Sequence, residues 1–458
     1  MVVFADEFDV VVVGSGIAGL TAATSAVQAG MTVVLLEKTE EVGGSSAMSG
    51  GWFAFSGTGE QAAAGVDDSH GAFRDDLLEV GQHHNDGELV EAYLLHQRDA
   101  YEWLTGLGVR FGELGISAGM SVPRGVLTDI RAVLARLHTV FGELGGATRL
   151  NHRARRLVRG ADGRVGAVVV ATGQGERCYV GRRAVVLATG GFSRSSRLLR
   201  TFAPEQLRAI PHGGPGNTGD GLLMAWRLGA GMADMAFVSG TYGSHPDTGD
   251  RVHELLSAYY SGAVIVNRQG RRFVDESLDY KTLGRAVLAQ PEGLGFQVFD
   301  AGVRALSRRG VPLKDIDTLE EIGHVHRAET LPALAEEAGI DGAGLVASID
   351  AYNAAVDGER ADVVGRTRLC NGQGDLRRID EPPFFAYPAK TLMTTTYCGL
   401  TITPRAEVLD VDGNVIDGLY AIGEVTGGFH GAAYMTGTSL GKGTVFGRIV
   451  AGHIAARH

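Results

Sequence analysis

Residues 10–37 read VVVVGSGIAGLTAATSAVQAGMTVVLLE, and this stretch decides the fold. The run Val10–Val13 is continuous and β-branched, which predicts a strand buried on both faces of a parallel sheet. It leads into GSGIAG at Gly14–Gly19, and the residues that follow have helical character. A second apolar run then stops at Glu37. A G-x-G-x-x-G turn between a strand and a helix, with an acid after the next strand, predicts a site for an adenine dinucleotide.

Each glycine of this turn has its own steric reason. Gly14 permits the tight turn, Gly16 lets backbone approach a pyrophosphate, and Gly19 lets the helix pack closely on the strand. The N-terminus of the helix, which includes Ala18, favours the negative charge of the phosphates. Glu37 can accept hydrogen bonds from the ribose hydroxyls. The turn alone leaves open whether the dinucleotide carries nicotinamide or flavin.

Composition limits the class of protein. The 458 residues carry a net charge of −11, with 44% hydrophobic and 21% charged residues, as expected of a globular protein of about two domains. The negative charge argues against nucleic acid or anionic membrane as main partner, and no apolar run approaches a membrane span. The first residues lack the basic start of a signal peptide, so we expect a cytoplasmic protein. The three cysteines have no short spacing, which predicts neither a disulfide framework nor a metal site.

The residues after Glu37 narrow the choice of cofactor. They read KTEEVGGSSAMSGG up to Gly51, a second loop rich in small residues. This combination resembles the flavoproteins of the fumarate reductase and succinate dehydrogenase superfamily, in which Glu-Lys precedes a Gly-Gly-(Asn/Ser)-(Ser/Thr) stretch and then Ser-Gly-Gly. The resemblance implies FAD. It also implies that Ser45 and Ser46 contact the pyrophosphate and that residues 49–51 lie along the flavin.

The same loop bears on how FAD is attached. Superfamily members with covalently bound FAD carry a histidine here, whereas this chain has no histidine before His70 and has Gly44 at the corresponding position. We therefore expect non-covalent FAD. Taken together, the residues expected at the cofactor are Gly14, Gly16, Ala18, Gly19, Glu37, Lys38, Gly44, Ser45, Ser46, Ser49, Gly50, Gly51, Ala188, Thr189, Gly190, Asp220, Glu424, Ser439 and Leu440.

Several of these residues lie far along the chain, in segments that match the same superfamily. A predicted strand at Ala184–Ala188 ends in Thr189-Gly190, a turn typical of backbone close to a dinucleotide. The stretch Asn217–Gly221 resembles the helix entry beneath the flavin, where Asp220 can act at the helix start. Glu424 resembles the acid that binds the ribityl chain. Ser439 and Leu440 begin a helix whose N–H groups would point at flavin N1 and O2.

The order of these segments predicts the domain organisation. We expect an α/β fold, with a Rossmann-like FAD domain of the glutathione reductase type and an inserted α+β capping domain. The expected limits are 1–236 and 391–458 for the FAD domain and 237–390 for the capping domain. The stretch 267–276 (NRQGRRFVDE) resembles the superfamily's capping domain. Helices are predicted at Asp129–Leu144, from its apolar face, and at Leu331–Ala355.

Two positions in the resemblance point to the substrate. In fumarate reductases, hydride passes through flavin N5, one arginine after the Phe-Val-Asn-Glu stretch donates the proton, and a second arginine after His-Gly-Ala helps to clamp a dicarboxylate. Here these positions hold Tyr280 and Tyr434, and an upstream histidine pair falls at about Thr395 and Thr396. The loss of these cationic and basic residues argues against fumarate, succinate or aspartate as substrate.

Tyrosines at these positions resemble the 3-ketosteroid Δ4-(5α)-dehydrogenases, whose loop reads Tyr-x-Ser-Gly-Thr-Ser-Leu-Gly-x-Gly-Thr. Residues 434–444 read YMTGTSLGKGT, so Thr436 keeps the hydroxyl of the serine. The resemblance implies an enzyme that forms or reduces a C=C bond next to a carbonyl of a neutral ketone such as a 3-ketosteroid. The catalytic residues that it implies are Tyr280, Tyr434, Thr436 and Gly437.

Two other hypotheses stay open. The chain could reduce or oxidise a small unsaturated carboxylate similar to fumarate, urocanate or tricarballylate, with Arg271, Arg272 or His245 as anion ligands. It could instead be a flavin-carrying electron-transfer subunit, although it has no cluster-binding cysteines. For an enzyme, we expect a small-molecule substrate together with an electron acceptor or donor that the sequence does not identify.

Overall fold

The computed structural model describes residues 5–117, 119–238, 240–248, 254–370, 374–393 and 395–457. The chain forms two compact units. The first unit comprises Met1–Pro204, Gly213–Val238 and Thr394–His458, and the second comprises Glu205–His212 and Ser239–Met393. The predicted limits of the FAD and capping domains, at residues 236/237 and 390/391, stay predictions.

The first unit is built on a mixed sheet of eight strands, which confirms the α/β class. Strand β1 (Ala5–Val13) lies parallel to β2 (Val33–Leu36) on one side and to β9 (Gly175–Leu187) on the other, and β19 (Val415–Ala421) continues the sheet beside β9. Strands β7 (Arg153–Arg159) and β8 (Val165–Thr172) form an antiparallel pair that joins the sheet through β9.

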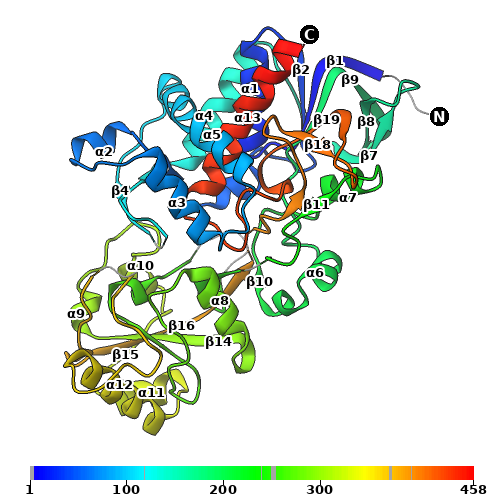
Figure 1. The fold of residues 1–458 in the computed structure, drawn as a ribbon. Coiled ribbons are helices and arrows are strands. Elements are labelled where there is room, and N and C mark those ends of the chain that lie inside the picture. Colours follow the sequence, from blue (N-terminus) through cyan, green and yellow to red (C-terminus); the bar gives the residue numbers. More distant parts are fainter. Residues whose placement is uncertain are drawn as a thin grey trace. The chain divides into compact units, whose positions relative to one another are not determined.

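Strands β6 (Ala147–Arg149) and β18 (Glu407–Leu409) complete the sheet. The other elements of the first unit are drawn with it in Figure 1. They are α1 (Ile17–Gln28), η1 (Gly44–Met48), β3 (Trp52–Ala54), α2 (Gly59–Ala63), α3 (His70–Val80), α4 (Gly87–Gly106), β4 (Leu114–Gly115), β5 (Gly125–Leu127), α5 (Ile130–Glu143), α6 (Ser196–Phe202), α7 (Asp220–Trp226), β11 (Met232–Ala233), β17 (Gly399–Leu400), η5 (Gly423–Val425) and α13 (Thr438–Arg457).

Helices α1 and α13 lie side by side although about 400 residues separate them (Figure 1). Two glycines of α13 make this close packing possible. A Cβ atom at Gly447 would lie 2.9 Å from Thr21 of α1, and one at Gly443 would lie 2.8 Å from Ile17. Two of the glycines near the C-terminal end of the sequence therefore allow α13 to pack closely on α1.

The second unit is organised around strand β16 (Phe384–Met393), which pairs with four other strands. Figure 1 shows α8 and the pair α11–α12 on opposite sides of strands β14 and β16. The other elements of this unit are β10 (Ile210–Pro211), β12 (Thr241–Ser244), η3 (Ala258–Ser261), β13 (Val264–Val266), α8 (Tyr280–Leu288), η4 (Pro291–Gly293), β14 (Leu294–Phe299), α9 (Ala301–Arg304), α10 (Ile316–Glu321), β15 (His326–Ala328), α11 (Leu331–Ala338) and α12 (Gly342–Val356). The short helix η2 (Pro204–Arg208) spans the junction of the two units.

Two helix predictions had different outcomes. The helix predicted at Asp129–Leu144 is confirmed as α5, with Asp129 as its N-cap and the predicted apolar face buried. The single helix predicted at Leu331–Ala355 is wrong, because the chain breaks it into α11 and α12. Gly339 ends α11 in the left-handed conformation (φ +67°), and Asp341 caps the start of α12. Both are ordinary helix stop and start signals.

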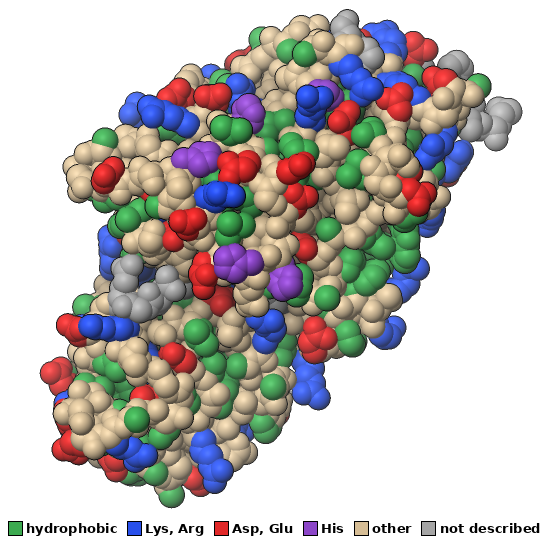
Figure 2. Space-filling view, viewed as in Figure 1, with side chains coloured by type: hydrophobic (Ala, Val, Ile, Leu, Met, Phe, Trp, Pro, Cys, Tyr) green, Lys and Arg blue, Asp and Glu red, His purple; other side chains and the backbone are tan. Residues whose placement is uncertain are grey.

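Surface charge in the face drawn in Figure 2 is mixed, with lysine and arginine interspersed among aspartate and glutamate. That face therefore presents no broad field of one sign. Within the part of the chain that the structure describes, no helix has both the length and the apolar character that crossing a bilayer requires.

Two stacked histidines, one buried and one half-buried, lie in the second unit. The rings of His245 and His324 are nearly parallel, with centroids 3.8 Å apart, and Tyr387 packs against His245. Carboxylates lie near each ring, 3.9 Å away on Asp247 and 3.5 Å away on Glu254. Burial, followed by the proximity of His324, lowers the pKa of His245 to about 4.

This pKa predicts a loss of stability in acid. A folded-state pKa below the ordinary value of 6.5 means that the unfolded chain binds more protons than the native chain between pH 6.5 and about 4. Stability is therefore full above pH 6.5 and falls by roughly 1–3 kcal/mol toward pH 4. Urea unfolding across this range should show the fall, and His245→Gln should flatten it. The matched variant His96→Gln, at an exposed histidine of α4, should leave the pH dependence unchanged, and a flat wild-type profile would contradict the assignment.

Candidate functional site

The turn after β1 brings together the residues expected at a pyrophosphate. Gly16 is the N-cap of α1 and has no side chain to cap the helix, so the positive end of the helix dipole favours an anion there. A Cβ atom at Gly16 would lie 3.3 Å from Ser46 Oγ, and the Ile17 N–H donates to the same oxygen at 3.1 Å. The loop of η1, which carries Gly44, Ser45 and Ser46, therefore faces the N-terminus of α1.

The other two glycines of the turn act through packing. A Cβ atom at Gly14 would lie 2.2 Å from the carbonyl oxygen of Ala188, and one at Gly19 would lie 1.8 Å from that of Gly14. Both approaches exclude any side chain. Ala18 is buried, and Cβ atoms at Gly423 and Gly443 would each lie within 3.3 Å of it. The helix start is thus enclosed by the later segments η5 and α13.

Glu37 lies buried at the end of β2, where four donors hold its carboxylate. Oε2 accepts hydrogen bonds from the N–H (3.1 Å) and hydroxyl (2.6 Å) of Ser15. Oε1 accepts from the N–H (2.9 Å) and hydroxyl (3.0 Å) of Thr39. Since a carboxylate has about four acceptor sites, a ribose hydroxyl has to take the place of one of the two rotatable hydroxyls.

A chain of hydrogen bonds joins three segments that are distant in sequence. The amide of Asn217 donates to Ser45 Oγ (3.3 Å) and to the carboxylate of Glu424 (3.1 Å). Glu424 also accepts the Thr396 N–H at 2.8 Å. A Cβ atom at Gly191 would lie 1.9 Å from Thr396 Oγ1 and 2.6 Å from Glu424 Oε1. Only glycine can occupy position 191 without displacing the side chains of Thr396 and Glu424.

Two buried oxygens beside this chain have no hydrogen-bond partner among the described residues. They are Asn217 Oδ1 and Thr189 Oγ1. A Cβ atom at Gly190, which has φ +69°, would lie 3.2 Å from Asn217 Oδ1. Buried acceptors without a donor are uncommon in folded proteins, and a bound ligand with hydroxyl groups supplies the missing donors. The residues therefore fit a dinucleotide with a polyhydroxyl chain.

Lys38 and Asp220 meet in a network beside the sheet. Asp220 lies at the start of α7 and binds Lys38 Nζ at 2.9 Å and Arg153 through two hydrogen bonds of 2.9 and 3.0 Å. Although burial opposes ionisation, the hydrogen bonds from Arg153 and Lys38 lower the pKa of Asp220. Its N-cap is Gly219 and no side chain caps this helix, so Asp220 acts through ion pairs here.

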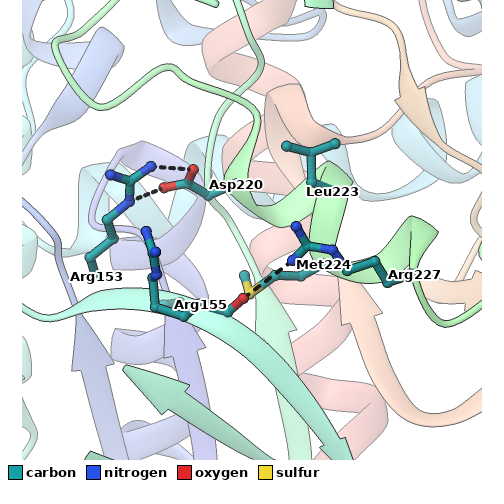
Figure 3. Close-up of a pocket in the computed structure, with 7 residues that line it drawn as sticks. Arg153, Arg155, Asp220, Leu223, Met224 and Arg227 are labelled. Carbon is teal, nitrogen blue, oxygen red and sulfur yellow. Dashed lines mark hydrogen bonds and ion pairs between the residues drawn. The ribbon is translucent and has the colours of Figure 1, made fainter. Parts of the chain in front are cut away.

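An open cavity of about 220 Å³ adjoins this network (Figure 3). Its lining residues come from β7 and α7 and its flank. They are Arg153, Ala154, Arg155, Asp220, Leu223, Met224 and Arg227. Three arginines against one carboxylate make the lining electropositive, and Ala154 and Met224 supply apolar surface. Such a lining is suited to a flat, polar group attached to phosphate.

The flavin-side loop after η1 runs over β5. Ser49 and Gly50 lead into Gly51, which has φ +80° and lies so close to Thr128 that a Cβ atom would be 2.0 Å from its carbonyl oxygen. The Thr128 N–H in turn donates to the Gly51 carbonyl at 3.0 Å. These contacts fix the backbone that is expected to lie along a flavin.

The glycine-rich loop that carries Tyr434 is held by a turn at residues 81–86. Asp86 N–H donates to the Gly428 carbonyl (2.7 Å), and Asn85 Nδ2 donates to the Phe429 carbonyl (2.8 Å). Asp234 accepts the Gly428 N–H at 2.7 Å. Further on, Gly437 has φ +90° and a Cβ atom there would lie 2.6 Å from the backbone of β3. This part of the sequence is a fixed loop.

Tyr434 lies half-buried in a cluster of three rings. The centroid of its ring is 5.5 Å from that of Tyr397 and 5.6 Å from that of His430, and the latter two are 5.8 Å apart. Thr436 is half-buried two residues further on. Tyr397 was not predicted as a site residue, because its neighbours show no periodicity that predicts burial. The one sequence feature that could have indicated it is its position directly after Thr395 and Thr396, which align with the histidine pair of fumarate reductases.

Helix α13 begins at Thr438, directly after this loop. Ser439 and Leu440 lie in its first turn, where backbone N–H groups have no intrahelical acceptor. One turn further, Lys442 is buried and donates to the Thr426 carbonyl at 2.8 Å. Burial lowers the pKa of Lys442 to about 8. The positive end of α13 and this buried lysine favour negative charge at the helix start.

Tyr280, the other predicted catalytic tyrosine, belongs to the second unit. It is the first residue of α8 and is buried, with Asp279 as N-cap. The buried ammonium of Lys281 lies 5.6 Å from the centroid of its ring and also donates to Thr241 Oγ1. The described contact of the Tyr280 ring is therefore with a cation, the ammonium of Lys281.

Comparison with known proteins agrees with this geometry. Residues 9–440 match the family of the FAD binding domain. A probable fumarate reductase of Shewanella frigidimarina is 32% identical over 456 residues, which are 98% of this chain and 75% of that protein. The chain belongs to the FAD-binding flavoproteins related to fumarate reductase. It is an FAD-dependent dehydrogenase or reductase that acts on C=C bonds and the CH–CH bonds that correspond to them.

Two further relatives of this flavoprotein have other substrates in their names. A urocanate reductase of Eggerthella lenta is 30% identical over 466 residues, covering 98% of this chain and 75% of the relative. The structure of a 3-ketosteroid Δ4-(5α)-dehydrogenase from Rhodococcus jostii aligns over 99% of this chain and 98% of its own, with a TM-score of 0.80 and 26% identity. The substrate class therefore differs among relatives that share the fold.

Position 191 offers a direct test of the cofactor site. In Gly191→Ala, the new methyl group would overlap Thr396 Oγ1 and press on Glu424, so the affinity for FAD should fall by at least about tenfold. The ratio of flavin to protein absorbance after dialysis measures the loss. Gly452→Ala is the matched control, because no atom lies within 4 Å of a Cβ atom there. Wild-type FAD content in Gly191→Ala would show that the hydrogen-bonded set does not form part of the site.

Proposed function

We propose that this flavoprotein introduces or reduces a C=C bond next to the carbonyl of a neutral, ring-shaped ketone similar to a 3-ketosteroid. The supporting observation is the aromatic surrounding of Tyr434 in the first unit. Its described ring contacts are a second tyrosine and a histidine. An apolar ketone is compatible with such a wall, whereas a dicarboxylate needs cationic partners there.

The anion ligands expected for an unsaturated carboxylate do not support that alternative. Arg272 is buried and engaged by Glu276 through hydrogen bonds of 2.7 and 2.8 Å and by Asp362 at 2.5 Å. Arg271 is exposed. His245, with its pKa lowered to about 4, is neutral near pH 7. A buried arginine already paired with two carboxylates has little remaining attraction for a substrate anion.

The site residues have distinct roles in this proposal. FAD, when bound, supplies the hydride chemistry. Tyr434 holds or accepts the proton that enters or leaves the carbon next to the one that exchanges hydride, and Thr436, two residues further along the loop, orients that phenol. Backbone N–H groups near Gly437 polarise the ketone oxygen. Tyr280 is proposed as a second phenol in the proton transfer.

The cofactor residues are assigned by the same proposal. The N-terminus of α1 and Ser46 bind the pyrophosphate, Glu37 binds the ribose, and Glu424 with Asn217 binds the ribityl hydroxyls. The adenine end lies toward Lys38 and Asp220, whose network adjoins the cavity in Figure 3. Non-covalent attachment also belongs to the proposal, so acid precipitation should release all the flavin into the supernatant. A cytoplasmic location stays a prediction.

The experiment that tests the function is anaerobic bleaching of the bound flavin. The saturated ketones 5α-androstane-3,17-dione and cyclohexanone are added separately, with succinate and dihydrourocanate as the carboxylate arm. Bleaching by a ketone and not by a carboxylate supports the proposal. For the reverse direction, dithionite-reduced enzyme is mixed with 4-androstene-3,17-dione, fumarate or urocanate. Reoxidation only by an acid would overturn the neutral-ketone proposal in favour of the carboxylate alternative.

Tyr434→Phe tests the proton-transfer role. The variant should keep its FAD, because the ring contacts remain, while the rate of flavin bleaching by the ketone should fall by at least about 100-fold. Stopped-flow absorbance measures this rate. Tyr420→Phe is the matched control, since Tyr420 is a buried tyrosine of β19 in the same unit. An unchanged rate in Tyr434→Phe would remove Tyr434 from the mechanism.

A further inference from the structure

Tyr397 has a backbone conformation that tyrosine rarely adopts. Its φ angle is +23°, in the left-handed range that favours glycine, and its side chain is only 1% exposed. A large residue in this conformation costs of order 1–3 kcal/mol, and it persists where the surrounding contacts impose it. The sequence places a tyrosine here even though glycine would relieve the strain.

The contacts that impose this conformation come from both sides of Tyr397. Before it, the Thr396 N–H donates to Glu424 at 2.8 Å, and the Cys398 N–H closes a tight turn onto the Thr396 carbonyl. After it, Gly399 lies so close to Val425 that a Cβ atom would be 2.1 Å from its carbonyl oxygen. The backbone of Tyr397 is therefore anchored to the segment that carries Glu424.

The strained backbone directs the ring of Tyr397 toward the loop of Tyr434. The planes of the two rings are inclined at 48°, and His430 meets Tyr397 and Tyr434 edge-on at 73° and 71°. Inclined aromatic pairs at 5.5–5.8 Å are mutually attractive. Tyr434 itself lies between Gly431 (φ +60°) and Gly437 (φ +90°), two positions at which the loop backbone takes the left-handed conformation.

We propose that Tyr397 is a positioning residue that holds the phenol of Tyr434 in the orientation required for proton transfer. This inference rests on the proposed function, because it assigns the proton step to Tyr434. The ring of Tyr397, rather than its hydroxyl, carries the role. A misplacement of about 1 Å in a reacting group can lower a rate by about 100-fold, so a smaller side chain at position 397 has a large effect.

A double-mutant cycle separates this role from a structural one. With 5α-androstane-3,17-dione as the reductant, the flavin bleaching rate should fall at least tenfold in Tyr397→Leu and stay within threefold of wild type in Tyr397→Phe. In the Tyr434→Phe background, Tyr397→Leu should lower the rate by less than twofold. If the fold-decreases in rate caused by Tyr397→Leu and Tyr434→Phe multiply in the double variant, the inference is overturned, because Tyr397 would then act independently of Tyr434. A Tyr397→Phe rate as low as that of Tyr397→Leu would also overturn it, by assigning the role to the hydroxyl.

A second measurement needs no substrate and keeps the inference testable if no ketone reacts. In holoenzyme containing [ζ-¹³C]tyrosine, the resonance of Tyr434 is the one missing from Tyr434→Phe. It should shift in Tyr397→Leu and keep its position in Tyr397→Phe. An unshifted resonance in Tyr397→Leu would overturn the inference. If Tyr397→Leu does not retain FAD, Tyr397→Met replaces it in both measurements with the same expected results.

Failure of this inference and failure of the proposed function give different results. If the function is wrong, no ketone bleaches the wild-type flavin, or Tyr434→Phe is as fast as wild type, while the ¹³C resonance still reports whether Tyr397 holds Tyr434. If only the inference is wrong, Tyr434→Phe is slow and Tyr397→Leu is as fast as wild type.

Discussion

The carboxylate of Glu424 is the interaction on which the site depends. It accepts hydrogen bonds from Asn217 and Thr396, and Asn217 extends the set to Ser45. Segments of the first unit that are far apart in the sequence are therefore held at one point. Removing this partly buried charge would leave its donors without an acceptor, which costs more than the hydrogen bonds themselves contribute. The strained turn at Tyr397 also begins at this carboxylate.

Electrostatics divides the FAD-binding unit into two regions of different character. Around Lys38, Arg153 and the cavity of Figure 3 the surroundings are cationic, as suits phosphate and ribose. Around Tyr434 the described contacts are the aromatic rings of Tyr397 and His430. The cationic groups around Asp220 and the rings around Tyr434 therefore come from different segments of the chain.

The sequence predicted those parts of the fold that local rules govern. The βαβ unit followed from Val10–Val13 and the glycines after it, and α5 followed from its cap at Asp129 and its apolar period. The break at Gly339 was missed, because a helical pattern on both sides concealed a stop signal. The ion pairs of Asp220 and the ring contacts of Tyr397 could not be predicted, since both join residues far apart in the chain. Such contacts form only when the folded chain brings the distant residues together.

The close packing of α13 on α1 has a consequence for biosynthesis. About 400 residues separate the two helices, and the enclosure of the α1 N-terminus needs Gly423 and Gly443. At roughly 5–20 residues per second, the ribosome makes the first βαβ turn about 20–80 seconds before the helix that encloses it. During that time the nascent phosphate loop has no partner on this side. The N-terminus of α1 can be enclosed on this side only after α13 has been made, so this enclosure is a late event in the synthesis of the chain.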